Sequence, residues 1–166
     1  MSNYYIVSAH FTTKLIGLFV PLYFMKLSHI QENIHWQVAH AAVQVAVEHA
    51  REIGVHIAAA VVDKGGNLVA FLRTEEGPYM SVNIAIDKAY TSASFGVPTS
   101  QWDELLASGS ILREAIVSRD RFVAFSGGLP IVIDGGCLGA IGVSGASEEQ
   151  DEACAQAGLN AIINRK

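Results

Sequence analysis

Apolar residues recur every three or four positions between Ile30 and Val45, a spacing typical of an amphipathic helix. Ser28 and Gln31 stand at the start of this stripe with the spacing of a capping box, in which each side chain bonds to the backbone N–H of the other residue. Gly54 follows the stripe and is a typical helix end. The pattern therefore predicts a first helix that begins at Ser28 and ends near Gly54.

Two later stretches have the pattern of β-hairpins, in which two apolar runs flank a turn rich in glycine. The turns are Asp63-Lys64-Gly65-Gly66 and Asp134-Gly135-Gly136, where glycine can adopt a positive φ angle without steric cost. The predicted strands are residues 55–62 paired with 67–74, and residues 131–133 paired with 137–143.

The other apolar segments indicate helices. Residues 81–95 stop at Gly96 and Pro98 and predict a second long helix. Ser147 is expected to cap the last helix, because it precedes a run of acidic residues that favour a helix N-terminus. Shorter helices are expected at residues 101–107 and 111–118. The order helix, hairpin, helices, hairpin, helix predicts an α+β domain with an antiparallel sheet and flanking helices.

Composition adds an expectation about partners. The chain has 166 residues, enough for one domain, and charged residues make up 16% of it, against about 25% in typical proteins. So little charge favours a homo-oligomer, a dimer or larger, although a monomer with a bland surface is the alternative. The net charge of −5 and the lack of a basic tract argue against a nucleic-acid partner.

Residues 1–24 are interpreted as an N-terminal extension to a domain of residues 25–166. Their ten-residue apolar run, Leu15 to Phe24, is interrupted by Pro21 and is shorter than the roughly 20 residues that span a bilayer. Three interpretations remain: an upstream start, a signal-like or anchoring segment, and an arm that contacts another subunit. We expect no membrane span and a cytoplasmic location, with export if the extension acts as a signal.

Three segments carry a family resemblance. They are Ile84–Thr91 continuing into Phe95–Thr99, Val61–Ala70, and Leu138–Ala146 continuing into Glu148–Asp151. In this order they resemble the GlcG/HbpS-like family, the haem-degrading DUF336 domain that also occurs at the C-terminus of PduO-type proteins. The resemblance implies a profilin-like or GAF-like layered fold, usually oligomeric, that binds haem or another tetrapyrrole, with haem degradation or redox sensing as the associated chemistry.

Histidine is the first candidate for contact with such a ligand. All six histidines lie in the first 56 residues, and those of the first helix are not spaced three or four apart, so we predict no metal-binding cluster. They are interpreted as surface or interface residues. A haem needs only one axial ligand, and His35, beside Trp36, is the candidate for that role.

The segment around Asp87 and Lys88 is the second candidate. The resemblance implies that Lys88, Tyr90 and Thr91 contact the ligand, Lys88 by neutralising a carboxylate or propionate and the other two through their oxygens. The alternative is a solvated charged face. Because the neighbours of Asp87 and Lys88 are apolar, at least one of the two is expected to be partly buried and paired.

Arg73 and the pair Gly127 and Gly128 complete the candidates. Arg73 closes a predicted strand and could clamp a carboxylate, or form a salt bridge with Glu75 or Glu76. The glycines lie in the predicted loop 126–130, where backbone N–H groups could approach a ligand or serve a tight turn. The small residues from Gly139 to Gly145 predict a strand against which another backbone packs closely, as a structural feature and a subunit contact.

Two other functions stay open from the residues alone. Arg73, Lys88 and the glycine loop would suit a small carboxylate as well as a haem propionate. The chain could therefore be an enzyme or accessory factor that acts on a small organic acid or aldehyde, as family domains in glycolate and diol catabolism imply. The third possibility is an oligomeric scaffold that binds no ligand.

Overall fold

The computed structural model describes residues 26–106 and 111–164. Residues 26–31 are the described part of a first unit and contain no helix or strand, and the second unit begins at Glu32. The expected extension of residues 1–24, with its three interpretations, lies outside the described residues. Among the described residues, no helix has the length and apolar character needed to cross a membrane.

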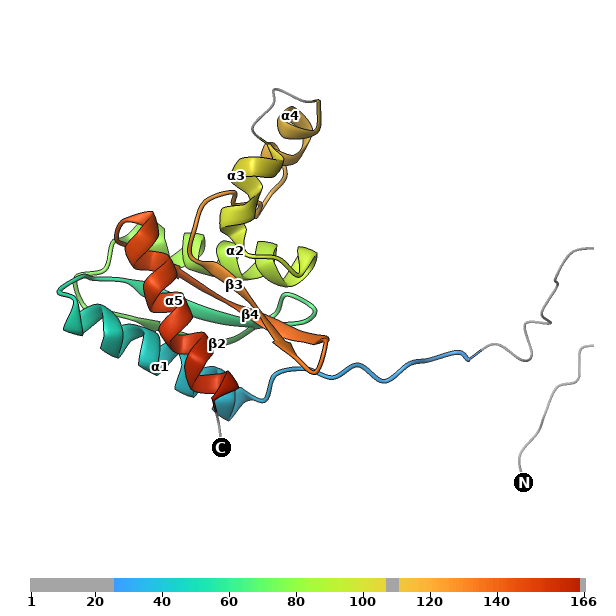
Figure 1. Ribbon diagram of the computed structural model, residues 1–166, viewed down its shortest axis with the longest axis horizontal. Coiled ribbons are helices and arrows are strands. Elements are labelled where there is room, and N and C mark those ends of the chain that lie inside the picture. The colour runs from blue at the N-terminus through green and yellow to red at the C-terminus, as the bar shows by residue number, and fades with distance from the viewer. Residues whose placement is uncertain (1–25, 107–110, 165–166) are drawn as a thin grey trace, which may run out of the picture. The chain divides into compact units, whose positions relative to one another are not determined.

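A four-stranded antiparallel sheet forms the centre of the second unit (Figure 1). Its strands lie in the order β2-β1-β4-β3, so the two hairpins meet through β1 and β4. Their bounds are Ala58–Asp63 for β1, Leu68–Arg73 for β2, Gly128–Ile133 for β3 and Gly136–Ser144 for β4. Both predicted hairpins are confirmed. β3 begins inside the predicted loop 126–130, and Pro130 is accommodated there because β3 is an edge strand.

Most helices lie where the sequence predicts them. α2 ends at Gly96, which has a left-handed φ of 69°, and Ser147 and Gln150 form a capping box at the start of α5. The helices are α1 (Trp36–Glu52), α2 (Tyr79–Phe95), the 3₁₀ turn η2 (Thr99–Gln101), α3 (Trp102–Leu105), α4 (Ile111–Val117) and α5 (Glu148–Ile163). The α+β class with an antiparallel sheet is confirmed.

The predicted start of the first helix at Ser28 is wrong. α1 begins at Trp36, and its N-cap is His35, whose Nδ1 accepts a hydrogen bond from the Gln37 backbone N–H. The reason lies just before it, where the chain is held by long-range contacts. The Ile34 N–H donates to the Leu138 carbonyl at 3.0 Å, and the Ile34 side chain is buried in the core. These contacts outweigh a local capping pattern.

Helices cover both faces of the sheet (Figure 1). α1 and α5 lie side by side on one face, where their buried side chains meet Val61, Ile141 and Val143. α2 covers the other face, where alanines of α2 meet alanines of β1 and β4. Since successive strand residues point to opposite faces, the sheet has one face of large side chains and one of small ones.

The face with small side chains lets α2 approach the sheet very closely. A Cβ at Gly142 would lie 2.1 Å from the Ala85 carbonyl oxygen and 2.5 Å from the Ala89 nitrogen. The prediction that another backbone packs against the small residues of this strand is confirmed, and here that backbone is α2 of the same chain. The predicted subunit contact at this strand stays a prediction.

Candidate functional site

A pocket of about 320 Å³ opens beside the second half of α2. α2 contributes Tyr90, Thr91 and Phe95 to its wall, and α4 contributes Ile116. The remaining wall is the segment Arg119–Phe122, which follows α4. The pocket therefore combines aromatic and aliphatic surface with two arginines and one aspartate, Asp120.

Arg121 occupies a constrained position on this wall. Its guanidinium carbon lies 3.7 Å from the centre of the Tyr90 ring, within the range of a cation–π contact, and its Nε donates to Asp87 Oδ1 at 2.9 Å. Arg121 also has a φ of 67°, which is uncommon for a residue other than glycine. These side-chain contacts thus offset the energetic cost of the positive φ angle, and they fix the Arg121 guanidinium at the pocket.

Thr91 holds the backbone of the same segment. Its hydroxyl donates to the Arg121 carbonyl at 3.0 Å and accepts a hydrogen bond from the Val123 N–H at 3.1 Å. Tyr90, its neighbour, packs on the β1–β2 turn, where a Cβ at Gly66 would lie 2.5 Å from the Tyr90 ring. The two predicted site residues of α2 therefore lie together at the pocket, and each is held by a segment distant in sequence.

Lys88 lies inside the protein. Its side chain is fully buried, and Nζ donates to Asp151 Oδ2 at 2.8 Å and to the Val143 carbonyl at 2.9 Å. Phe125 covers the ammonium at 4.6 Å from the ring centre. The expectation that Asp87 or Lys88 is buried and paired is confirmed. The predicted contact of Lys88 with a ligand stays a prediction, and it would require this ion pair to open.

Burial shifts the pKa of both partners. Loss of water lowers the pKa of the Lys88 ammonium and raises the pKa of the Asp151 carboxyl, because burial disfavours each charged form. The hydrogen bond and the attraction between the two charges oppose both shifts. Because Lys88 belongs to α2 and Asp151 to α5, this buried pair joins the two helices inside the protein.

Gly127 and Gly128 lie against this ion pair. A Cβ at Gly127 would be 2.9 Å from Lys88 Nζ, and a Cβ at Gly128 would be 2.6 Å from the Lys88 carbonyl oxygen. The Gly128 N–H donates to Thr99 Oγ1 at 2.9 Å. The structure thus places the two glycines where β3 passes close to α2, and their predicted contact with a ligand stays a prediction.

His35 and Arg73 lie away from this pocket lining. His35 is exposed at the start of α1, where its ring centre is 6.0 Å from that of Trp36. Arg73 Nη1 donates to the Gly77 carbonyl at 3.1 Å, and its guanidinium lies 5.0 Å from the centre of the Tyr79 ring. Among the described residues, these contacts and not an ion pair with Glu75 or Glu76 hold the Arg73 side chain. Their predicted roles toward a ligand stay predictions.

Comparison with known proteins gives a family match and close structural relatives. A family model described as "Haem degrading protein HbpS-like" matches residues 34–160. An uncharacterized 15.0 kDa protein from the dhaT–dhaS intergenic region of Citrobacter freundii is 34% identical over 118 residues, which are 70% of this chain and 83% of that protein.

Two crystal structures are similar over most of the chain. The Klebsiella pneumoniae protein ORFY, described as DUF336, has a TM-score of 0.81 and 29% identity, covering 86% of this chain and 99% of that one. The PduOC:haem complex has a TM-score of 0.73 and 28% identity, covering 79% of this chain and 96% of that one.

Proposed function

The chain belongs to the HbpS-like family, as its three motifs predicted, and on this premise we propose that it binds haem in the pocket beside α2. The family description and the similarity to the PduOC:haem complex support this proposal. The observation that carries it is the composition of the pocket wall, which joins aromatic and aliphatic side chains to two arginines.

This wall fits the chemistry of a porphyrin. Phe95, Ile116 and Phe122 offer apolar surface to a flat ring, and Arg119 and Arg121 offer guanidinium groups to the propionates. The volume of about 320 Å³ is at the small end of ligand pockets, which range from about 300 to 1,000 Å³. One edge of the haem would enter the pocket and the rest would remain outside it.

Tyr90 is the proposed axial ligand. Haem iron is held in proteins by histidine, cysteine, methionine or tyrosine side chains, and Tyr90 is the residue of these types among those that line the pocket. When bound, the haem would supply a redox-active iron. The chain's own residues would orient it, with Arg121 fixed by Asp87 and Thr91.

His35 remains the alternative axial ligand, but its present contact opposes that role. A neutral imidazole that accepts the Gln37 N–H at Nδ1 carries its proton on Nε2, which is then unable to bind iron. Ligation through Nε2 would move the proton to Nδ1 and break the N-cap of α1. Loss of such a cap costs about 1 kcal/mol.

A titration of the purified chain with hemin tests the proposal. Wild type should bind near one hemin per chain, and Tyr90→Phe should shift the Soret band, whereas Tyr79→Phe, which alters an exposed tyrosine, should not. Arg121→Gln should weaken binding by about tenfold or more, as expected for loss of a charged hydrogen bond. The Soret band of His35→Ala should have the same position as that of His49→Ala.

Two results would contradict this site. A Soret change in His35→Ala alone would move the axial ligand to α1. A spectrum unchanged by Tyr90→Phe, by Thr91→Val and by every single histidine substitution would reject the haem site and favour the small-acid alternative.

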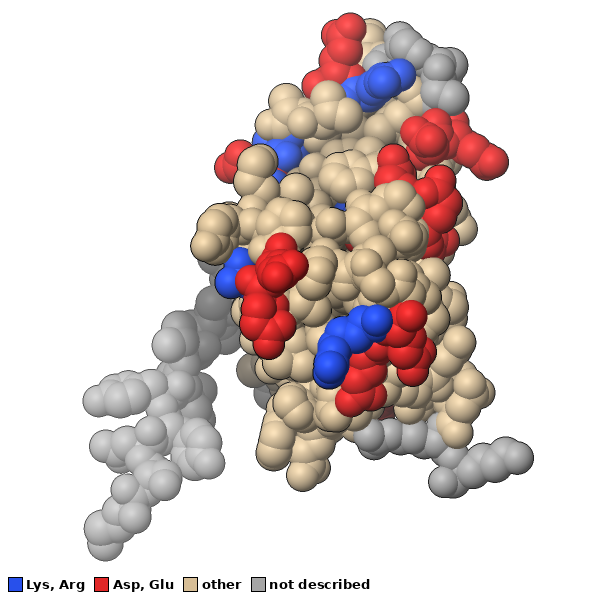
Figure 2. All heavy atoms as spheres, turned by 90° about the vertical axis from the view of Figure 1, so that its left-hand side faces the viewer, with Lys and Arg blue, Asp and Glu red and all other residues tan. Residues whose placement is uncertain are grey.

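We also propose that the chain forms a homo-oligomer, because apolar side chains remain exposed on α3 and α4. Leu105, Ile111, Leu112 and Val117 are each more than half exposed. On the face in Figure 2, uncharged residues cover most of the surface and the Lys and Arg side chains lie apart from one another. Light scattering should give a mass above 17.8 kDa, and a monomer at micromolar concentration would contradict this.

Two further expectations concern nucleic acid and location. Scattered cations and a net charge of −5 make binding to nucleic acid unfavourable, which a gel-shift assay at low salt would check. A cytoplasmic location is the proposed one, and cell fractionation would test it.

A further inference from the structure

Arg121 uses only part of its guanidinium for contacts within the protein. Its Nε donates to Asp87 Oδ1, and the flat face of the guanidinium lies over the Tyr90 ring. Within residues 26–106 and 111–164, neither Nη atom has a hydrogen-bond partner. Because the side chain is 39% exposed, a ligand can reach the edge that carries the two Nη groups.

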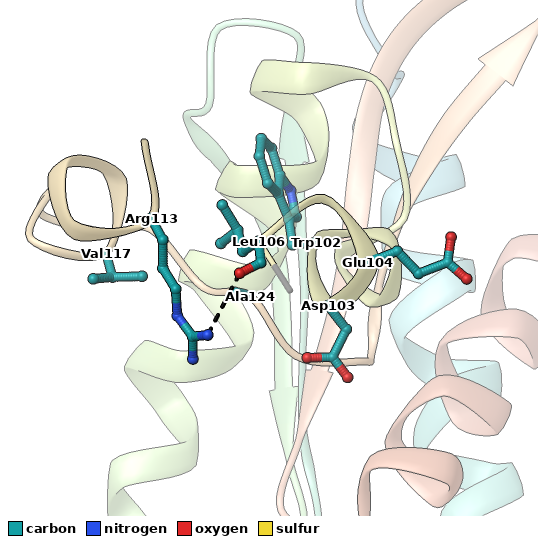
Figure 3. A pocket seen from close by; sticks show the side chains of 7 residues that line it. All are labelled: Trp102, Asp103, Glu104, Leu106, Arg113, Val117 and Ala124. Carbon is teal, nitrogen blue, oxygen red and sulfur yellow. Dashed lines mark hydrogen bonds between the residues drawn. The ribbon is translucent and has the colours of Figure 1, made fainter. Parts of the chain in front are cut away.

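Two other arginines show what is particular to Arg121. Arg119 lines the same pocket, but its side chain is exposed and has no ion pair in the described part of the chain. Arg113 lines a second pocket, of about 440 Å³, to which α3 and α4 contribute (Figure 3). Its Nη1 donates to the Leu106 carbonyl at 3.4 Å, so this guanidinium already uses an Nη group within the protein. Of the three, only Arg121 has a fixed guanidinium whose Nη groups are both unused.

Asp87 determines where these Nη groups point. Asp87 and Tyr90 stand three positions apart on α2 and therefore lie on the same side of the helix. One bonds the Nε of Arg121 and the other supports the face of its guanidinium, and these two contacts fix a planar group in both position and orientation. The support is rigid because the backbone of α2 is already in contact with the sheet at Gly142.

Two unused Nη groups on one edge match a carboxylate, whose oxygens can accept two parallel N–H bonds. A haem has two such groups, its propionates. Asp120 also lines the pocket and would repel a second carboxylate there. On the basis of the haem binding proposed above, we infer that Asp87 is a positioning residue that directs Arg121 to one propionate, so that the site selects tetrapyrroles with at least one free propionate.

The sign of one effect separates positioning from simple attraction between charges. Asp87 is itself an anion, so by charge alone its removal should strengthen the binding of an anionic ligand. If Asp87 orients Arg121, its removal should weaken binding instead. Asp120 is the matched control, because it lies at the same pocket and has no ion pair in the described part of the chain. Asp120→Asn should strengthen hemin binding about twofold, the scale of an exposed charge pair.

Hemin, its monomethyl ester and its dimethyl ester form a graded series of probes for the whole chain, followed by Soret titration. The monomethyl ester should bind as hemin does, and the dimethyl ester about tenfold more weakly, because it has no carboxylate for Arg121. Asp87→Ala should weaken binding of hemin and the monomethyl ester about fivefold or more, and should leave binding of the dimethyl ester and the Soret position unchanged. Asp87→Asn keeps an acceptor for Nε and should lie between Asp87→Ala and wild type.

Arg121→Lys tests whether Asp87 acts through Arg121. It keeps the positive charge but loses the planar group with two Nη donors, so it should weaken hemin binding about as much as Asp87→Ala. Adding Asp87→Ala to Arg121→Lys should then cause no further loss. A further loss of the same size as in wild type would show that Asp87 acts independently of Arg121.

Three other outcomes would overturn the inference. Equal affinity for hemin and its dimethyl ester would show that no propionate is recognised, while haem binding itself would stand. Hemin bound by Asp87→Ala as tightly as by wild type, or more tightly, would show that Asp87 does not position Arg121. A loss in Asp87→Ala that is equal for all three probes would make its role structural. Wild type that binds none of the probes would reject the proposed function, and this inference with it.

Discussion

Lys88 Nζ and Asp151 Oδ2 form a 2.8 Å ion pair across 63 residues of sequence, at a point where both side chains are buried. Removing one partner would leave an uncompensated buried charge. Lys88→Met should therefore lower the free energy of unfolding by about 3–5 kcal/mol, as measured by urea denaturation.

The double variant Lys88→Met/Asp151→Asn is the control for this prediction. Asparagine is uncharged and can still accept the Ala146 N–H bond that Asp151 Oδ1 now accepts at 3.0 Å. Most of the lost stability should return. An unfolding free energy unchanged in Lys88→Met would instead show that the ammonium has no structural role and would favour its predicted contact with a ligand.

Gly142→Ala should be far more damaging than Gly54→Ala. The new methyl group at position 142 would lie 2.1 Å from the Ala85 carbonyl oxygen, so α2 must move, at a cost of about 3 kcal/mol. Gly54 has a φ of 73° but open space around it, so alanine there should cost about 1 kcal/mol from the backbone alone. Thermal unfolding of the two variants would make the comparison, and equal melting temperatures would contradict it.

Asp63 should give stability a dependence on acid pH. Burial raises the pKa of its carboxyl, but hydrogen bonds from Asn67 and Gly65 together outweigh this and hold the pKa below its usual value. A pKa that is lower in the folded state stabilises the fold above about pH 4, and this contribution disappears as the pH falls through the folded pKa. Asp63→Asn should thus lose less stability than wild type between pH 5 and pH 2, followed by urea unfolding at each pH.

The two cysteines should differ in reactivity. Burial and the negative charge of Asp151 raise the pKa of the Cys154 thiol to about 11, and its side chain lies in the core. Cys137, in β4, is partly exposed. Because the thiolate is the reactive form, a thiol reagent at pH 8 should label one cysteine per chain, and the second only after denaturation. Rapid labelling of Cys154 in folded Cys137→Ser, or of both thiols in the folded wild type, would contradict this.

Local sequence patterns predicted the helices and strands well where residues close together in the sequence determine the structure. The glycine turn at Asp63–Gly66, the end of α2 at Gly96 and the cap at Ser147 all follow from residues within a few positions of one another. The start of α1 could not be predicted in this way. The capping pattern at Ser28 competes with a hydrogen bond from Ile34 to Leu138, which is about a hundred positions away.

The candidate site could likewise be predicted where neighbours in sequence form it, but not where distant segments meet. The motif around Lys88 drew attention to α2, and Tyr90 and Thr91 do line a pocket. Arg121 was missed because its contacts with Asp87 and Tyr90 join segments more than 30 residues apart. Two arginines in the short gap between a predicted helix and a predicted strand were the available signal.

The close approach of α2 to Gly142 also decides which parts of the protein can move. Because the α2 backbone already touches the sheet, sliding or rolling this helix would drive main-chain atoms into one another. α4 has no buried residue and can shift at little cost. Adjustment to ligands of different size should therefore come from α4, which contributes to both pockets, while the α2 wall keeps its shape. Hydrogen exchange should be fast in α4 and slow in α2.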